Sequence, residues 1–476
     1  MRVLYGGAAL VASATLAIHK LVGRDEDVQS EIIIPVHELT TDARTFSADA
    51  IRRYMVVNGV PGVTVGVSVN GEDNWRAGFG YACVETGALC TPDTVMCIAS
   101  ISKSITAAIA ARYVDDCHLN LDDSIYKYIT PKDFPYKIVN GEKVDITIRQ
   151  LLSHSAGIRH YNKNDCLKKE NVENVENDEN NENKKTNNQN NKKNADNSNN
   201  KNNDKKKNAL LGDGQWSEFY LNKQFKSTTE SLELFRDDAL VAKPGERFYY
   251  TTHGYTLIAS ILEAAAGGRA FRNLLADLCS ELGLNKTSVD EYTPICAKRA
   301  RYYYRDAKTH QLKNIPQVNN SYKIAGGGIV SNVEDLLTFA NVMLYSYQNV
   351  LPCSPKPFIK RETMKQLWSD STPSNKDVNA SRGRYGLGWV SVPESELIIG
   401  GVNPLRNSGY WYHTGAAVGA SSILLIKPST RDGSTNPKGV CVAILANCYG
   451  AHGGLVTLAR EIAFAFEKEM QSIKHQ

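Results

Sequence analysis

Residues 97–106 read "CIASISKSIT" and place Ser100 and Lys103 among small and apolar side chains. If a helix begins here, a serine and a lysine at this spacing lie on the same face and can touch. Burial lowers the pKa of a lysine from its usual value of about 10.4, and the dipole at a helix N-terminus acts in the same direction. A decrease of about three units makes the amine a base at neutral pH. The stretch is therefore compatible with a serine nucleophile paired with a lysine base, but the spacing alone is weak evidence for that pair.

The setting of this pair matters more than its spacing. The pattern Ser-x-x-Lys also occurs at Ser124–Lys127 and Ser198–Lys201, but neither has both small apolar residues before it and a long apolar helical stretch after it. After Ser100 and Lys103 the chain continues "SITAAIAARYV" (104–114), which is typical of a buried helix. The other two matches are coincidental on this interpretation.

Two later motifs add to the first. They are "KPGERFYYTTHGYTLIASILEAAAG" (243–267) and "WYHTGAAVGASSILLIKP" (411–428). Together with "SISK" (100–103) they resemble the serine β-lactamase and penicillin-binding-protein superfamily, in which Ser-x-x-Lys precedes a Tyr-x-Asn type and a Lys-Thr-Gly type motif.

A narrower resemblance rests on four stretches: "TIRQLLSHSAGIRHY" (147–161), "NNSYKIAGGGIVSNVEDLLTFANVML" (319–344), "YGLGW" (385–389) and "HTGAAVGASS" (413–422). These stretches are similar to the mitochondrial serine β-lactamase-like proteins of animals, which are relatives of class C β-lactamases. The resemblance covers about residues 48–468, interrupted by one Asn-rich segment.

This resemblance implies a role for each matching residue. Ser100 is the nucleophile, and Lys103 receives its proton directly or through Tyr250. The backbone N–H groups of Ser100 and Ala416 form the oxyanion hole. Tyr250 has an ordinary pKa near 10, so it is a base only if cations stabilise its phenolate, and Lys103 and a protonated His413 are the expected sources.

The third motif departs from the family pattern in one place, and the second motif in another. His413-Thr414-Gly415 stands where the family has Lys-Thr-Gly, so a titratable group replaces a fixed cation. Thr414 is expected to orient substrate polar groups, and Gly415 to let substrate approach the backbone. Thr252 stands where the family has asparagine, which removes an amide that holds the substrate side chain. Acyl transfer survives both changes, but efficient antibiotic hydrolysis is not expected.

Other polar residues have structural interpretations. We expect His154 to end a helix and bond a turn, and His253 to be structural. The glycine-rich "AGGGIVS" (325–331) has no following lysine at a phosphate-binding spacing, so tight backbone packing is expected there.

The fold class follows from segments at both ends of the chain. Residues 59–82 alternate valines with small or polar residues around Asn70-Gly71, which predicts a β-hairpin. Residues 421–428 and 439–448 predict two more strands, and 453–470 predicts an amphipathic helix. We therefore expect an α/β (α+β), β-lactamase/transpeptidase-like fold: an antiparallel sheet flanked by terminal helices, with an inserted, mostly helical subdomain.

Composition narrows the function further. The 476 residues are 42% hydrophobic with a net charge of +4, and no basic stripe with interleaved aromatics occurs, so no nucleic acid partner is expected. The ten cysteines form no C-x-x-C pair, and neither a metal nor a cofactor is expected. Cys83, Cys90 and Cys97 can pair in an oxidising compartment, but buried free thiols are the favoured interpretation.

The sequence divides the chain into four parts. Residues 1–24 are a targeting or anchor segment, and from composition alone a mitochondrial presequence, a secretory signal and a membrane anchor all stay open. Residues 25–47 are a linker, 48–468 the hydrolase domain, and 162–208 a disordered Asn/Lys/Glu-rich insertion.

The resemblance implies a mitochondrial serine protease of the intermembrane space that regulates mitochondrial lipid metabolism. It also implies a peptide or protein substrate, a homo-oligomer or filament, and association with the inner membrane; secretion is the second choice of location. An esterase or D-aminopeptidase would use the same residues, and a mainly structural filament-forming protein is the other alternative.

Overall fold

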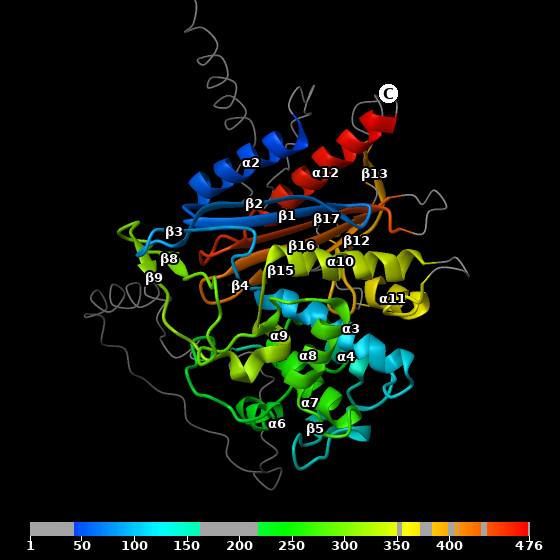
Figure 1. Ribbon diagram of the computed structural model, residues 1–476. Coiled ribbons are helices and arrows are strands. Elements are labelled where there is room, and N and C mark those ends of the chain that lie inside the picture. Colours follow the sequence, from blue (N-terminus) through cyan, green and yellow to red (C-terminus); the bar gives the residue numbers. More distant parts are fainter. Residues whose placement is uncertain are drawn as a thin grey trace, which may run out of the picture. The chain divides into compact units, whose positions relative to one another are not determined.

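An eight-stranded antiparallel sheet forms the centre of the computed structural model (Figure 1), in the order β11-β12-β15-β16-β17-β1-β2-β3. The structure describes residues 42–161, 218–349, 355–371, 383–397, 405–407, 409–429 and 436–474. The strands of this sheet are β1 (Gly62–Val69), β2 (Glu72–Cys83), β3 (Ala88–Leu89), β11 (Arg384–Tyr385), β12 (Val390–Val392), β15 (Tyr410–Ala416), β16 (Ser421–Pro428) and β17 (Gly439–Ala446). The predicted segments 1–24 and 162–208, and most of the linker 25–47, lie outside the described residues.

Strands from both ends of the chain pair at the centre of the sheet. β1 lies antiparallel to β17 with Val65 opposite Ile444, and every residue of β17 is buried. The hairpin of β1 and β2 turns at Asn70 (φ +55°) and Gly71 (φ +85°), the left-handed conformations that a tight hairpin turn requires. The predicted hairpin and the sheet built from both termini are therefore confirmed.

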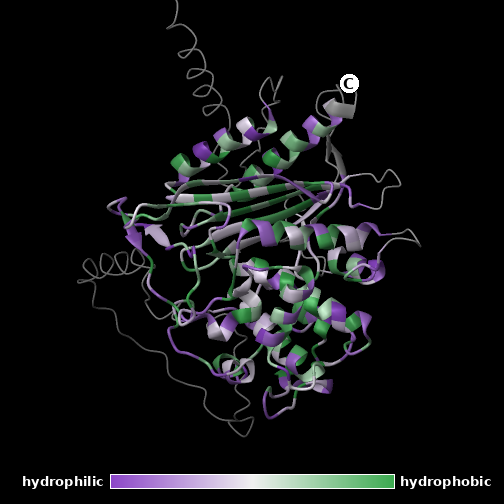
Figure 2. Ribbon diagram, in the orientation of Figure 1, coloured by the Kyte–Doolittle hydropathy of each residue, from purple (hydrophilic) through white to green (hydrophobic). Residues whose placement is uncertain are grey.

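Two terminal helices cover one face of this sheet (Figure 1). α2 (Ala43–Asn58) packs against α12 (Leu455–Lys474), and α12 packs on β16 and β17. The predicted stripe on α12 is buried, with exposed fractions of 4% or less for Leu455, Leu458, Ile462 and Phe466. Hydrophobic residues concentrate in the central strands and on the sides of the helices that face them (Figure 2).

The fold extends to the N-terminal side of residue 48, where the domain was expected to start. Helix α2 begins at Ala43, because the side chain of Asp42 accepts hydrogen bonds from the backbone N–H groups of Arg44 and Thr45 and caps the helix. Ala43 and Ser47 are buried, so residues 43–47 are part of the fold rather than of a linker.

Helices and short hairpins cover the other face. α10 (Val333–Gln348) packs on β1, β16 and β17, and α3 (Ser102–Asp115) packs on α7 and α9. The remaining helices are α4 (Ile148–Leu152), α6 (Thr228–Ser231), α7 (Thr252–Ala265), α8 (Phe271–Leu282), α9 (Ile324–Gly327) and α11 (Arg361–Trp368). The remaining strands are β4 (Met96–Cys97), β5 (Lys137–Val139), β6 (Glu142–Val144), β7 (Ser288–Val289), β8 (Tyr303–Arg305), β9 (Leu312–Asn314), β10 (Ile329–Ser331), β13 (Ser395–Leu397) and β14 (Leu405–Asn407). The α+β class with an inserted, mostly helical subdomain is confirmed.

The eight cysteines in the described ranges are free thiols. Cys90 and Cys97 are buried, as favoured from the sequence, whereas Cys83 is only partly buried. Among the same residues, no helix combines the length and apolar character needed to cross a bilayer.

Replacing a buried residue of α12 should destabilise the protein. Ile462→Ala removes a side chain with 0% exposure and should lower the free energy of unfolding by about 2–5 kcal/mol, measured by urea denaturation. The matched control is Phe464→Ala on the same helix, where the side chain is 51% exposed and the change should stay within about 0.5 kcal/mol. Equal effects of the two substitutions would contradict the observed orientation of α12.

Candidate active site

Ser100 lies in a tight turn that leads directly into α3. The turn is a short 3-10 helix, Ala99–Ile101, and Ala99 before the serine has φ +48°. A non-glycine residue in this region costs about 1–3 kcal/mol, which the surroundings must offset. The carbonyl oxygen of Ile98 accepts a hydrogen bond from Ser422 Oγ at 2.8 Å, and the backbone N–H of Ile98 donates one to Ile329 O at 2.9 Å. Bonds to β16 and β10 therefore hold the turn that carries the serine.

Strand β15 approaches this turn closely at Gly415. A Cβ added there would lie 2.4 Å from Ile98 O and 2.1 Å from Ser422 Oγ, so no side chain fits. The sequence predicted that Gly415 makes room for substrate. In the structure, the backbone of the serine's own turn lies in the space next to Gly415, so this packing also requires glycine.

Lys103 is completely buried and contacts three other chain segments. Its Nζ lies 3.1 Å from Ser100 Oγ, 2.5 Å from the carbonyl oxygen of Gly326 and 3.4 Å from Thr252 Oγ1. Burial holds the pKa of Lys103 well below its usual value, and the nearby charge of Lys323 lowers it further. A neutral amine has two hydrogens and one lone pair. Donation to Gly326 and Thr252 leaves the lone pair for the hydroxyl of Ser100.

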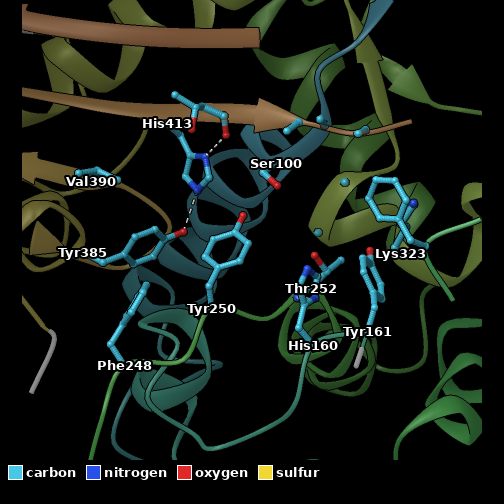
Figure 3. A pocket seen from close by; sticks show the side chains of 17 residues that line it. Ser100, His160, Tyr161, Phe248, Tyr250, Thr252, Lys323, Tyr385, Val390 and His413 are labelled. Atoms are coloured by element: carbon cyan, nitrogen blue, oxygen red, sulfur yellow. Dashed lines mark hydrogen bonds between the residues drawn. The ribbon is translucent and has the colours of Figure 1, made fainter. Parts of the chain in front are cut away.

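Tyr250 lies just before α7, with its ring centroid 4.8 Å from Lys103 Nζ. Its hydroxyl points toward Ser100 (Figure 3). Desolvation raises the pKa of Tyr250 well above 10, although a hydrogen bond with Ser100 acts in the opposite direction. Tyr250 is therefore a neutral phenol at physiological pH and a proton donor rather than a base.

The prediction that His413 is protonated is wrong. Burial lowers the pKa of His413 to about 3, and the proximity of Lys103 acts in the same direction. Its Nδ1 lies 2.6 Å from Thr414 O, an atom that only accepts, so Nδ1 carries the proton. Nε2 then accepts a hydrogen bond from Tyr385 Oη at 2.8 Å. His413 thus links β15 to Tyr385 and supplies no positive charge to a phenolate.

A cavity of about 430 Å³ opens over these residues. Six of the predicted residues line it: Ser100, Tyr250, Thr252, His413, Thr414 and Ala416. Lys103 contacts Ser100 from beneath, and Gly415 packs on the serine's turn. In the view of Figure 3, His413 and Tyr385 lie on one side of Ser100, and Lys323 and Tyr161 lie on the other.

Several residues of the cavity had no assigned role in the sequence. His160, Tyr161, Phe219, Phe248, Lys323 and Tyr385 also line it. Two of the stretches that carry the family resemblance, 147–161 and 319–344, contain three of these residues. Those stretches were the available signal, but spacing alone could not say which of their side chains reach the cavity.

Lys323 is a buried cation in the wall of this cavity. Its side chain is 3% exposed, and Nζ lies 5.0–5.8 Å from the ring centroids of Tyr322, Phe219 and Tyr161. Burial lowers its pKa to about 8, so it is mainly protonated at pH 7. In the described part of the chain no carboxylate lies within ion-pair distance of it. Asp290, which raises its pKa, is itself paired with Arg299.

The structural interpretations of three other features are confirmed. His154 follows α4 and accepts a hydrogen bond from Thr251 N at 3.2 Å. His253 Nε2 lies 2.9 Å from Glu218, which also pairs with the buried Arg159. In the glycine-rich segment, a Cβ on Gly326 would lie 2.7 Å from Thr252 Cγ2, so tight packing is required there.

The sheet, the inserted helices and the Ser100–Lys103–Tyr250 arrangement together define a serine hydrolase with the β-lactamase fold. The chain belongs to the β-lactamase family, whose model matches residues 48–466. It is 38% identical over 452 residues to the Homo sapiens "Serine beta-lactamase-like protein LACTB, mitochondrial", covering 89% of this chain and 79% of that protein. The Bos taurus protein of the same name is 40% identical over 461 residues, covering 90% and 80%. The resemblance expected from the sequence is therefore confirmed.

Solved structures agree on the fold. The octameric penicillin-binding protein homologue from Pyrococcus abyssi aligns with a TM-score of 0.63 at 22% identity, covering 90% of this chain and 77% of that one. A D-stereospecific amidohydrolase from Streptomyces sp. aligns with a TM-score of 0.58 at 20% identity, covering 88% and 98%.

A methyl group at residue 415 should disable the site. Gly415→Ala forces β15 away from the turn of Ser100, so the rate of Ser100 labelling by a fluorophosphonate should fall about 100-fold, consistent with a displacement of catalytic groups by about 1 Å. The matched control is Gly453→Ala, where an added Cβ meets nothing within 4 Å and labelling should not change. Labelling of Gly415→Ala at the wild-type rate would contradict the required close approach.

Proposed function

We propose that this chain is a mitochondrial serine peptidase that cleaves amide or peptide bonds through an acyl-enzyme on Ser100. The observation that carries the proposal is the buried amine of Lys103, which lies 3.1 Å from Ser100 Oγ and has a strongly lowered pKa. Such an amine accepts the serine proton at neutral pH without a histidine or a metal.

The geometry supports a specific proton path. Ser100 Oγ bonds to the substrate carbonyl carbon while its proton passes to Lys103 Nζ. The N–H groups of Ser100 and Ala416 stabilise the resulting oxyanion. Tyr250 donates its phenolic proton to the leaving nitrogen and recovers one from protonated Lys103. Water then attacks the acyl-enzyme and gives one proton to Lys103. As the acid leaves, Lys103 returns that proton to Ser100 Oγ, which restores the starting state.

The position of Lys323 supports a substrate that carries a negative charge. An ammonium group that is buried, held among aromatic rings and faces the cavity attracts an anion there more strongly than in water. The surrounding Phe219 and Tyr161 add apolar walls. We therefore assign the preferred substrate as a peptide with a carboxylate close to the scissile bond.

The biological setting of the proposal comes from the relatives. Those at 37–40% identity are named mitochondrial, which supports a mitochondrial location, and the finer assignment is the intermembrane space with inner-membrane association. Regulation of mitochondrial lipid metabolism and assembly into a homo-oligomer or filament belong to the same proposal.

A fluorophosphonate probe should label the wild-type protein and not Ser100→Ala. Lys103→Met should slow labelling by about 100-fold or more, because general-base catalysis contributes factors of that size. The matched controls are Ser124→Ala and Lys127→Met, which alter the same spacing on an exposed turn and should leave labelling unchanged.

Each other outcome identifies a different function. Labelling that persists in Ser100→Ala places the nucleophile elsewhere. A folded wild type that resists the probe supports the mainly structural, filament-forming alternative. Turnover of esters without turnover of any L- or D-peptide amide supports the esterase.

Lys323→Met should reduce the preference for acidic peptides. With an aspartyl or glutamyl peptide, KM should rise about ten-fold, since a hydrogen bond to a charged group contributes about 1.5–3 kcal/mol. With the matched asparaginyl or glutaminyl peptide KM should not change. In the wild type, KM for the acidic peptide should also rise as pH increases through about 8, where Lys323 loses its proton. Equal effects on both peptides would exclude Lys323 as the anion-binding group.

A further inference from the structure

His154 adopts a left-handed backbone conformation, which is uncommon for residues other than glycine. It follows α4 with φ +58°, in the left-handed region that costs a non-glycine residue about 1–3 kcal/mol. Glycine would adopt this conformation without that cost. The position nevertheless carries a large side chain with 0% exposure. The strain therefore requires a compensating role for the histidine side chain.

Both chain neighbours of Tyr250 are hydrogen-bonded to this one residue. The carbonyl oxygen of His154 accepts a hydrogen bond from Tyr249 N at 2.7 Å, and its Nδ1 accepts one from Thr251 N at 3.2 Å. Thr251 is also the N-cap of α7, and its Oγ1 donates to Arg159 O at 2.6 Å. The backbone on each side of the phenol is thus tied to the residue that follows α4.

The ring of His154 also contacts Tyr250 directly. The two ring centroids are 4.3 Å apart, and the centroid of Tyr385 lies 4.7 Å from His154 on a second side. Phe248 and Tyr255 complete the surroundings at 5.8 and 5.3 Å. Because these rings fill the space around the imidazole, a sideways shift of Tyr250 would have to displace His154.

The imidazole is held in one neutral form. Thr251 N can only donate, so Nδ1 is the acceptor and Nε2 carries the proton. Burial keeps the pKa of His154 well below 6.5, and Lys103 and His413 lower it further. Within the described residues Nε2 is buried and has no hydrogen-bond partner, so aromatic faces are the acceptors available to it. A buried polar atom without a partner, next to the reacting groups, calls for an explanation beyond the turn that His154 bonds.

We propose that His154 is the positioning residue for Tyr250. It holds the phenol over Lys103 and beside Ser100 through one hydrogen bond to its carbonyl oxygen, one to its Nδ1, and ring contact. This inference rests on the proposed function, in which Tyr250 protonates the leaving nitrogen. It adds a distinct consequence: loss of His154 should impair only reactions whose leaving group needs that proton.

The leaving group therefore separates this role from a general structural one. In His154→Gly the ring and the Nδ1 acceptor are lost, whereas glycine accepts the backbone angle. For a peptide amide, kcat should fall about 100-fold with KM within about three-fold, the size expected for a misplaced general acid. Hydrolysis of a p-nitrophenyl ester, whose leaving group departs as an anion, should stay within about three-fold of wild type, as should fluorophosphonate labelling.

Two further variants complete the experiment. His154→Asn tolerates positive φ and keeps an acceptor for Thr251 N, so it should show the same selectivity with a smaller, about ten-fold, loss on the amide. If His154→Gly does not fold, His154→Asn is used in its place to test the proposal. His310→Gly is the matched control, because His310 also has positive φ (+56°) but lies exposed on a loop, and it should change neither activity.

Equal losses on amide and ester in a folded His154 variant, or no loss on either, would overturn the positioning role. Failure of the wild type to react with the fluorophosphonate would instead overturn the proposed function. A second check uses Tyr250→Phe: in that background His154→Gly should cause no additional loss on the amide, because the group that it positions is already gone.

Discussion

The chemistry of this protein depends on keeping one amine away from water. Lys103 lies on α3 with no exposed surface, and desolvation holds its pKa well below the usual value because it disfavours the charged form. The same Ser-x-x-Lys spacing at Ser124–Lys127 has the opposite result. Lys127 is 62% exposed and pairs with Asp123 at 2.7 Å, and the hydrogen bond from that pair raises its pKa. Spacing brings the two groups together, but the pKa of the lysine depends on the surrounding fold.

Much of the fold could be predicted because its signals are local. The turn at Asn70-Gly71 and the apolar stripe on α12 are readable from a few neighbouring residues, and the family motifs located the serine and the lysine. Roles that depend on distant contacts could not be predicted in the same way. The neutral state of His413 follows from burial, and the close approach at Gly415 follows from the packing of β15 on a turn more than 300 residues before it in the chain.

Lys323 and His154 are two further residues whose roles depend on contacts that are distant in the sequence. Each lies in a stretch that resembles the family, yet neither stretch indicates what its side chain contacts. Lys323 becomes notable only when three aromatic rings and a cavity wall surround it. His154 becomes notable only when Tyr249 and Thr251, almost 100 positions later, bond to it. The sequence correctly predicts that His154 bonds a turn, but the identity of that turn carries the functional meaning.

The distribution of charge in the cavity explains why histidine is compatible with the strand position. In a small dry site, each protonated group makes the protonation of its neighbours more costly. With Lys323 protonated, the pKa of Lys103 is lowered further, and Lys103 in turn lowers that of His413. A permanent cation at residue 413 would add a second positive charge within this group. His413 instead acts as a neutral link between Thr414 and Tyr385, while Lys323 holds the positive charge on the opposite side of Ser100 (Figure 3).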